Sequence, residues 1–122
     1  MEPDELTQER IARNDARFRE ANEEIEATAL SHDLTDIRVP FICECADTGC
    51  VAIIRLSLPE YEEVRADSTT FINSPGHVAA GRGAAEVVAQ RERYEIVRKL
   101  GHAAEVVERM DPRRDSDEEA VS

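Results

Sequence analysis

Three cysteines lie within eight residues of one another, and they are the only cysteines in the chain: Cys43, Cys45 and Cys50. A histidine follows in a separate turn, Pro75-Gly76-His77. Three thiolates and one imidazole match the ligand set of a closed tetrahedral zinc site in number and chemistry. A small chain that uses such a site must bring the cysteine segment and the histidine turn together, which excludes most extended arrangements.

The spacing of the cysteines suits a hairpin. In an extended strand alternate side chains share a face, so Cys43 and Cys45 approach one ion together while Glu44 points the other way. The four residues that follow let the chain turn and return Cys50 to the same ion. The Pro-Gly turn fixes the direction of His77, and we predict one structural Zn²⁺ held by three cysteines and this histidine.

Other interpretations of the same residues remain open. His102 is the alternative fourth ligand. Cys43 and Cys45 also suit a strand as small buried hydrophobic residues, with Cys50 as a loop thiol. In a redox interpretation, two thiols form a reversible disulfide while the third attacks or releases metal, although the acidic neighbours of the cysteines disfavour the reactive thiolate. An iron–sulfur cluster would need histidine ligation.

Length and charge limit the class of protein. A chain of 122 residues fits one domain, with a folded unit of roughly 80 to 90 residues. Its formal charge of −12 disfavours direct binding to nucleic acid or to anionic membranes. No apolar run approaches the ~18 to 20 residues of a membrane span, and the acidic N-terminus is unlike a signal peptide. We therefore expect a cytoplasmic protein, where clustered cysteines bind metal more often than they form disulfides.

Residues 6–30 contain neither glycine nor proline and are rich in strong helix formers, which predicts a long N-terminal helix. Ile11, Phe18 and Ile25 recur every seven residues, and with Ala21 and Ala29 they form a narrow apolar stripe on an otherwise charged helix. Phe18 and Ile25 are expected to pack on the sheet of the same chain. The alternative is a coiled-coil pairing with a second chain.

The rest of the chain predicts short strands and helices. Ser57, followed by Pro59 and Glu60, has the pattern of a capped helix start. At the end of that helix, Arg65 is expected to pair with a carboxylate or with the thiolate-rich site. The expected elements are a hairpin of strands 39–43 and 51–56 with residues 47–49 at its tip, a helix to residue 65, a strand at 71–72, a hairpin at 86–90 and 94–99, and a helix at 103–110.

These expectations define an α+β fold with a small, mainly antiparallel sheet, a long N-terminal helix, a short middle helix and a zinc-knuckle hairpin. We divide the chain into an acidic helix and linker (1–36), a metal-binding α+β domain (37–112) and a disordered acidic tail (113–122).

The residues do not assemble a recognisable catalytic site. There is no His-x-Glu or His-Glu-x-x-His element, and cysteine-rich ligation weakens the Lewis acidity of a metal, even with Glu44 or Glu60 as a possible base. We expect a non-enzymatic zinc-binding interaction or regulatory module that engages another protein. A thiol-based redox or metal-responsive switch is the alternative, and a small metal-dependent enzyme is a third.

Several segments together resemble a family of small actinobacterial proteins that carry a CxCx4C segment and a PGH turn. The resemblance covers residues 14–113 and implies that the cysteines and the turn belong to one recurring pattern, but it implies no particular activity. It runs through Arg17-Phe18-Arg19-Glu20-Ala21-Asn22-Glu23, residues 41–50, Glu60-Tyr61-Glu62-Glu63-Val64-Arg65, Phe71, Pro75-Gly76-His77, residues 94–99 and Asp111-Pro112-Arg113.

Overall fold

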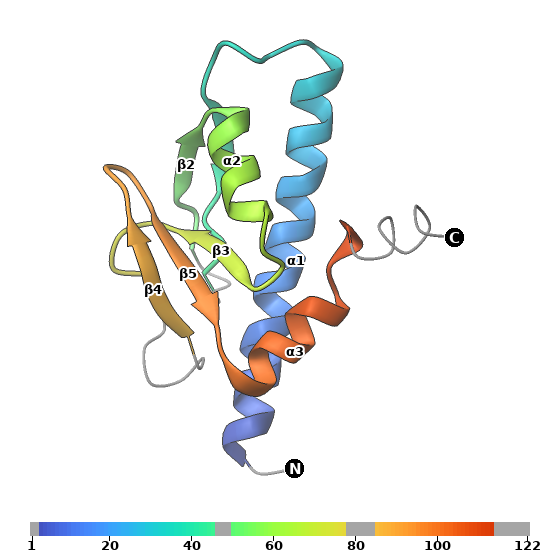
Figure 1. Ribbon diagram of the computed structural model, residues 1–122, viewed down its shortest axis with the longest axis vertical. Coiled ribbons are helices and arrows are strands. Elements are labelled where there is room, and N and C mark those ends of the chain that lie inside the picture. Colours follow the sequence, from blue (N-terminus) through green and yellow to red (C-terminus); the bar gives the residue numbers. More distant parts are fainter. Residues whose placement is uncertain (1–2, 46–49, 78–84, 114–122) are drawn as a thin grey trace.

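A single long helix, α1 (Pro3–Ser31), runs the length of the molecule in the computed structural model (Figure 1). The structure describes residues 3–45, 50–77 and 85–113. Within these ranges the other elements are β1 (Val39–Ile42), β2 (Ile53–Leu56), α2 (Leu58–Arg65), β3 (Thr70–Asn73), β4 (Ala85–Gln90), β5 (Glu95–Lys99) and α3 (Gly101–Arg109). This order confirms the α+β class. The predicted hairpin tip at 47–49 and nearly all of the predicted disordered tail lie outside the described residues.

The strands form two antiparallel sheets where one was expected. β1 pairs with β2, and Phe41 lies opposite Ile54. The second sheet has the order β3-β5-β4, with Ile72 opposite Ile96. The two sheets meet where the chain leaves β1. There the backbone N–H of Glu44 donates to the carbonyl of Ile72 in β3 at 2.8 Å. The cysteine segment is therefore attached to both sheets.

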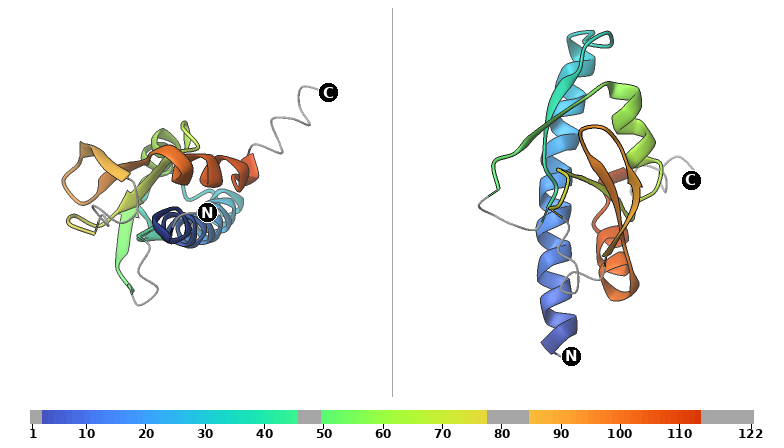
Figure 2. Two further views of the ribbon diagram at one scale, coloured as in Figure 1. Left: turned by 90° about the horizontal axis from the view of Figure 1, so that it is seen from below. Right: turned by 90° about the vertical axis from the view of Figure 1, so that its left-hand side faces the viewer.

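β1 and α3 both lie against α1 (Figure 2). One core cluster joins the β1–β2 hairpin, α2 and α1, and in it the rings of Phe41 and Tyr61 stack at a centroid distance of 4.3 Å. Tyr61 thus covers the hairpin. A second cluster packs α3 and Phe71 against Ala12 and Ala16 of α1.

The face that α1 buries differs from the predicted stripe. Ile11 is buried and Ile25 packs on the first core cluster, but Phe18 is only partly buried and belongs to neither cluster. Polar side chains take the centre of the buried face instead: Asp15, Arg19, Asn22 and Glu26. They are buried because other elements supply partners for them.

Two of these buried residues show what those partners are. Asp15 forms an ion pair with Lys99 of β5. Arg19 lies over the ring of Phe71 and donates to the carbonyl oxygens of Ser68 at 2.6 Å and Val107 at 2.8 Å. These bonds connect α1 to the segment just before β3 and to the end of α3. The polar face of α1 thus joins the β3-β5-β4 sheet and α3 to the N-terminal helix.

The predicted start of α2 is confirmed in detail. The hydroxyl of Ser57 accepts from the N–H of Glu60 at 3.2 Å, and the carboxylate of Glu60 accepts from the N–H of Ser57 at 2.8 Å. This reciprocal capping box satisfies two N–H groups that the first turn of a helix leaves without partners.

Candidate metal centre

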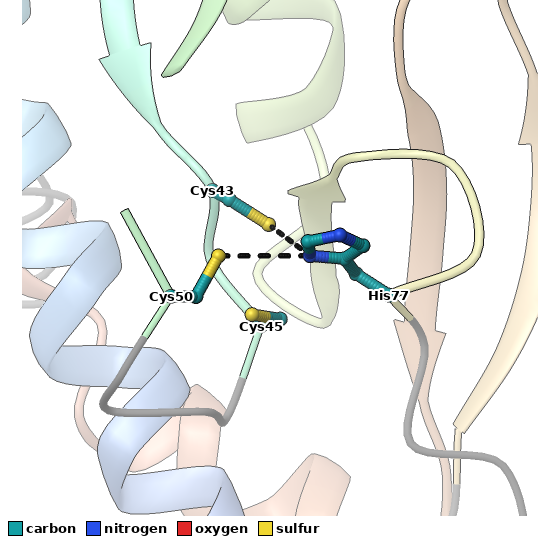
Figure 3. Close-up of side chains that lie close together, drawn as sticks. All are labelled: Cys43, Cys45, Cys50 and His77. Carbon is teal, nitrogen blue, oxygen red and sulfur yellow. Dashed lines mark hydrogen bonds between the residues drawn. The ribbon is translucent and has the colours of Figure 1, made fainter. Parts of the chain in front are cut away.

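Four side chains from three segments converge at one end of the β1–β2 hairpin. Cys43 and Cys45 follow β1, Cys50 leads toward β2, and His77 comes from the turn after β3 (Figure 3). Their sulfur atoms and a ring nitrogen all lie within 4.8 Å of one another. The four residues lie close enough to hold a metal ion, and their chemistry is compatible with zinc.

The distances from His77 agree with tetrahedral coordination. Its Nδ1 lies 3.6 Å from the Sγ of Cys43 and 3.6 Å from the Sγ of Cys50. Zinc with Zn–S and Zn–N bonds of ordinary length, at a tetrahedral angle, places sulfur and nitrogen about 3.6 Å apart. Both distances are therefore compatible with one cation between the three atoms.

The four candidate ligands are shielded from solvent on the cysteine side of the site only. Cys43 and Cys45 are 4% and 3% exposed and belong to the first core cluster, while Cys50 is half-buried and His77 is exposed. None of these three cysteines, all in the described part of the chain, is in a disulfide. The core therefore buries two of the ligands, whereas the histidine side is accessible to solvent.

The turn that carries His77 is tied to the cysteines through Ser74. The N–H of Ser74 donates to the Sγ of Cys43 at 3.2 Å, and the carbonyl of Ser74 accepts from the N–H of His77 at 3.0 Å. A backbone donor to sulfur stabilises negative charge on a metal-bound thiolate. Gly76 has a φ of +83°, a left-handed backbone conformation that residues with a side chain rarely adopt.

Glu44 lies between two of the ligands and points away from them, as predicted, into the interior of the fold. It is 1% exposed, and its carboxylate accepts from Asn22 Nδ2 at 2.8 Å and from the N–H of Ile72 at 2.9 Å. Burial raises the pKa of Glu44 to about 7, against the opposing effect of these two hydrogen bonds. The Cys-x-Cys segment is thus fastened on both faces.

Asn22 supports the cysteine segment and was not singled out by the sequence. Its amide oxygen accepts from the N–H of Ile42 at 2.9 Å, and its nitrogen donates to the carbonyl of Ile42 at 2.9 Å. The side chain therefore pairs with the last residue of β1 as a neighbouring strand would. The sequence signal that could have found it is its spacing from Arg19 and Glu26 along one helical face.

Other candidate residues lie elsewhere. His102 is on α3, 3.8 Å from a carboxylate oxygen of Glu9 and 3.7 Å from one of Glu105, so the structure brings His77 and not His102 to the cysteines. Glu60 is engaged in the capping box. Arg65 pairs with carboxylates, Asp111 at 2.6 Å and Glu23 at 3.2 Å, which confirms the first of its two predicted roles.

Within the described ranges, no helix combines the length and the apolar character that crossing a membrane requires. Comparisons with models of known protein families, with curated proteins and with solved structures found no match. The resemblance to small actinobacterial proteins therefore stays a prediction, and functional inference depends on the geometry of the site.

Proposed function

We propose that this chain is a non-enzymatic, cytoplasmic zinc-binding module, in which Cys43, Cys45, Cys50 and His77 hold one structural Zn²⁺. The observation that carries the proposal is the convergence of four ligand atoms within 4.8 Å, with His77 Nδ1 at 3.6 Å from two sulfur atoms. Four protein ligands complete a tetrahedron and leave no position for a substrate or a reactive water.

The position of the site supports a structural role. It joins the β1–β2 hairpin to the turn after β3, two segments that also meet through the hydrogen bonds of Glu44 with Ile72, the hydrogen bond of Ser74 with Cys43 and the packing around them. Three thiolates outweigh the charge of Zn²⁺ by one unit, and the N–H of Ser74 at Cys43 offsets part of that excess. A metal here would hold the hairpin in a fixed orientation for contact with a protein partner.

Native mass spectrometry of the purified, reduced protein tests the zinc site. We expect one zinc per chain, loss of zinc in Cys45→Ser, and weakened binding in His77→Ala. His102→Ala and His32→Ala are matched controls, because both remove an imidazole outside the cluster and should keep full zinc content. A folded wild-type protein without zinc, or equal zinc loss in His102→Ala and His77→Ala, would refute the assignment.

The partial exposure of Cys50 favours a second candidate function, a redox-responsive zinc switch. Here hydrogen peroxide oxidises two of the thiolates to a disulfide, two electrons reduce the peroxide to water, and the zinc is released. Release of zinc with formation of one disulfide at micromolar peroxide, while the protein stays folded, would support the switch. Retention of zinc until the fold is lost would support the structural role.

A further inference from the structure

Arginines gather on one face of this acidic molecule. Arg38 precedes β1, Arg55 belongs to β2, and Arg91 and Arg93 lie between β4 and β5. All four are exposed, and they line a hollow of about 150 Å³ together with Glu60, Glu92 and Tyr94. A chain with a formal charge of −12 thus presents a local excess of positive charge.

Most of this positive charge is not neutralised by the protein itself. Arg91 pairs with Glu63 at 2.7 Å. Within the described part of the chain, no carboxylate forms an ion pair with Arg38, Arg55 or Arg93. One of the two carboxylates that line the hollow, Glu60, is occupied by the backbone of Ser57. Three guanidinium groups are therefore available to an anionic ligand.

An apolar groove adjoins the hollow on the outer face of the β1–β2 hairpin. Its volume is about 610 Å³, and Arg38, Arg55 and Arg93 line it as well as the hollow. Pro40 lies opposite Arg55 in the strand register, and Ile53 is 54% exposed on the same side. Because alternate residues of a strand share a face, the hairpin presents arginines and apolar side chains side by side.

We propose that this surface, the arginine face (Arg38, Arg55, Arg91, Arg93, Pro40 and Ile53), binds an acidic segment of a partner protein. Carboxylates of the segment bind the guanidinium groups, which accept such groups in a two-point geometry. An apolar side chain of the same segment covers Ile53 and Pro40. The partner thus contacts the basic side of the hairpin and not the acidic surface of α1.

The chemistry of the surface favours a peptide over other anions. A free phosphate or a similar small anion has nothing to place in the apolar groove. A nucleic acid would bring a continuous row of phosphates toward a molecule of net charge −12, which repels it outside this patch. A short acidic segment with one apolar residue matches both the charge and the hollowed shape.

Selection from a display library of random twelve-residue peptides tests the proposal without assuming a partner. The full-length protein is the bait, and the double variant Arg55→Glu/Arg93→Glu is used for counterselection. We expect the enriched peptides to be rich in Asp and Glu with a recurring apolar residue. In fluorescence anisotropy their Kd should rise at least about tenfold on the double variant, a change of about 1.4 kcal/mol, and should also rise with salt.

The control variant Arg10→Glu/Arg17→Glu makes the same change in charge on exposed positions of α1 and should bind the peptides as the wild type does. Neutral or basic enriched peptides, equal loss of binding in both double variants, or tighter arginine-dependent binding of an oligothymidylate would overturn the proposal. Binding seen only after residues 114–122 are removed would assign the face to the chain's own acidic tail instead. Zinc content is measured on each variant, so that a loss of peptide binding can be distinguished from a loss of the metal site.

Discussion

At the scale of single residues, Asn22 and Glu44 form the polar centre of the contact between α1 and the cysteine segment. Asn22 is fully buried, and its amide makes three hydrogen bonds, two to the backbone of Ile42 and one to Glu44. A buried polar group that loses its partner costs more free energy than an exposed one, because water cannot replace the bond. This amide therefore has a large effect on stability.

We expect Asn22→Ala to lower the free energy of unfolding by about 2–4 kcal/mol, since it leaves the N–H and carbonyl of Ile42 and one oxygen of Glu44 without their partner. Urea denaturation followed by circular dichroism measures the change. Asn14→Ala, in the same helix at a half-buried position, is the control and should cost about 0.5 kcal/mol or less. Equal effects of the two substitutions would contradict the role given to Asn22.

A second residue-scale feature is a cluster of carboxylates around Arg113. Its guanidinium contacts Glu23 at 2.5 Å, Glu26 at 3.0 Å and Glu62 at 2.6 Å. Three carboxylates share this cation, which favours the protonated form of one of them. Burial, a hydrogen bond with Glu62 and the negative charges of Glu62 and Glu23 raise the pKa of Glu26 to about 8, although Arg113 opposes the shift.

This pKa predicts a dependence of stability on pH. The folded pKa of Glu26 lies above the unfolded value, so its stabilising contribution is complete below about pH 4.5 and is lost as pH rises toward about 8. Glu26→Gln keeps a neutral hydrogen-bond donor at all pH values. Its free energy of unfolding, relative to the wild type, should therefore increase from pH 5 to pH 8 and then level off.

Urea denaturation at a series of pH values measures this difference. Glu24→Gln is the control on the same helix, because Glu24 is exposed and should show no such trend. A difference between Glu26→Gln and the wild type that stays constant from pH 5 to pH 8 would show that Glu26 is already ionised in the folded protein.

At the scale of elements, α2 depends on its first turn. It has only eight residues, too few for an isolated helix to be stable, and its buried side chains include Tyr61 and Val64. The capping box of Ser57 and Glu60 begins the helix, and packing of Tyr61 on Phe41 holds it against the β1–β2 hairpin. The stability of α2 therefore depends both on local hydrogen bonds and on tertiary packing.

Ser57→Ala should lower the free energy of unfolding by about 1 kcal/mol, because the N–H of Glu60 loses its acceptor. Glu60→Gln should cost less, since an amide oxygen still reaches the N–H of Ser57. Chemical denaturation measures both variants. Ser31→Ala is the control, because the Ser31 hydroxyl donates to the exposed carbonyl of Thr28 at the C-terminal end of α1, outside α2. A loss of stability no greater in Ser57→Ala than in Ser31→Ala would refute the capping role.

At the scale of the whole molecule, the candidate metal centre belongs to only one of the two core clusters. Cys43 and Cys45 are part of the cluster around the β1–β2 hairpin, while the cluster between α1 and α3 contains none of the ligands. If zinc is bound as proposed, its binding free energy adds to the stability of the fold, and its removal should loosen the hairpin cluster first.

We expect a chelator to lower the midpoint of thermal unfolding by more than about 5 °C. Hydrogen exchange should speed up in the β1–β2 hairpin and at 74–77 more than in the contact of α1 with α3. Readdition of Zn²⁺ should restore both readings, and Mg²⁺, which prefers oxygen ligands, should not. His77→Ala is the matched variant and should respond less to the chelator. An unchanged midpoint after complete removal of the metal would exclude a structural role.

Features that depend on neighbours along the chain could be predicted from the amino-acid sequence alone. The helix over 6–30, the capping box at Ser57, the pairing of strands around the cysteines and the opposite directions of Cys43 and Glu44 follow from propensity, turn chemistry and strand alternation. The grouping of Cys43, Cys45, Cys50 and His77 was also predicted, because three thiols and one imidazole match the ligand set of a structural zinc site.

Contacts between distant segments determine which polar residues are buried and which groups meet across the fold. Phe18 looked like a core residue and is not, whereas Arg19 and Asn22 lie at 0% exposure. Whether a polar side chain is buried depends on partners such as Ile42 and Val107 that come from distant parts of the chain. The division into two sheets and the gathering of arginines have the same cause: they depend on contacts between elements, which no local pattern encodes.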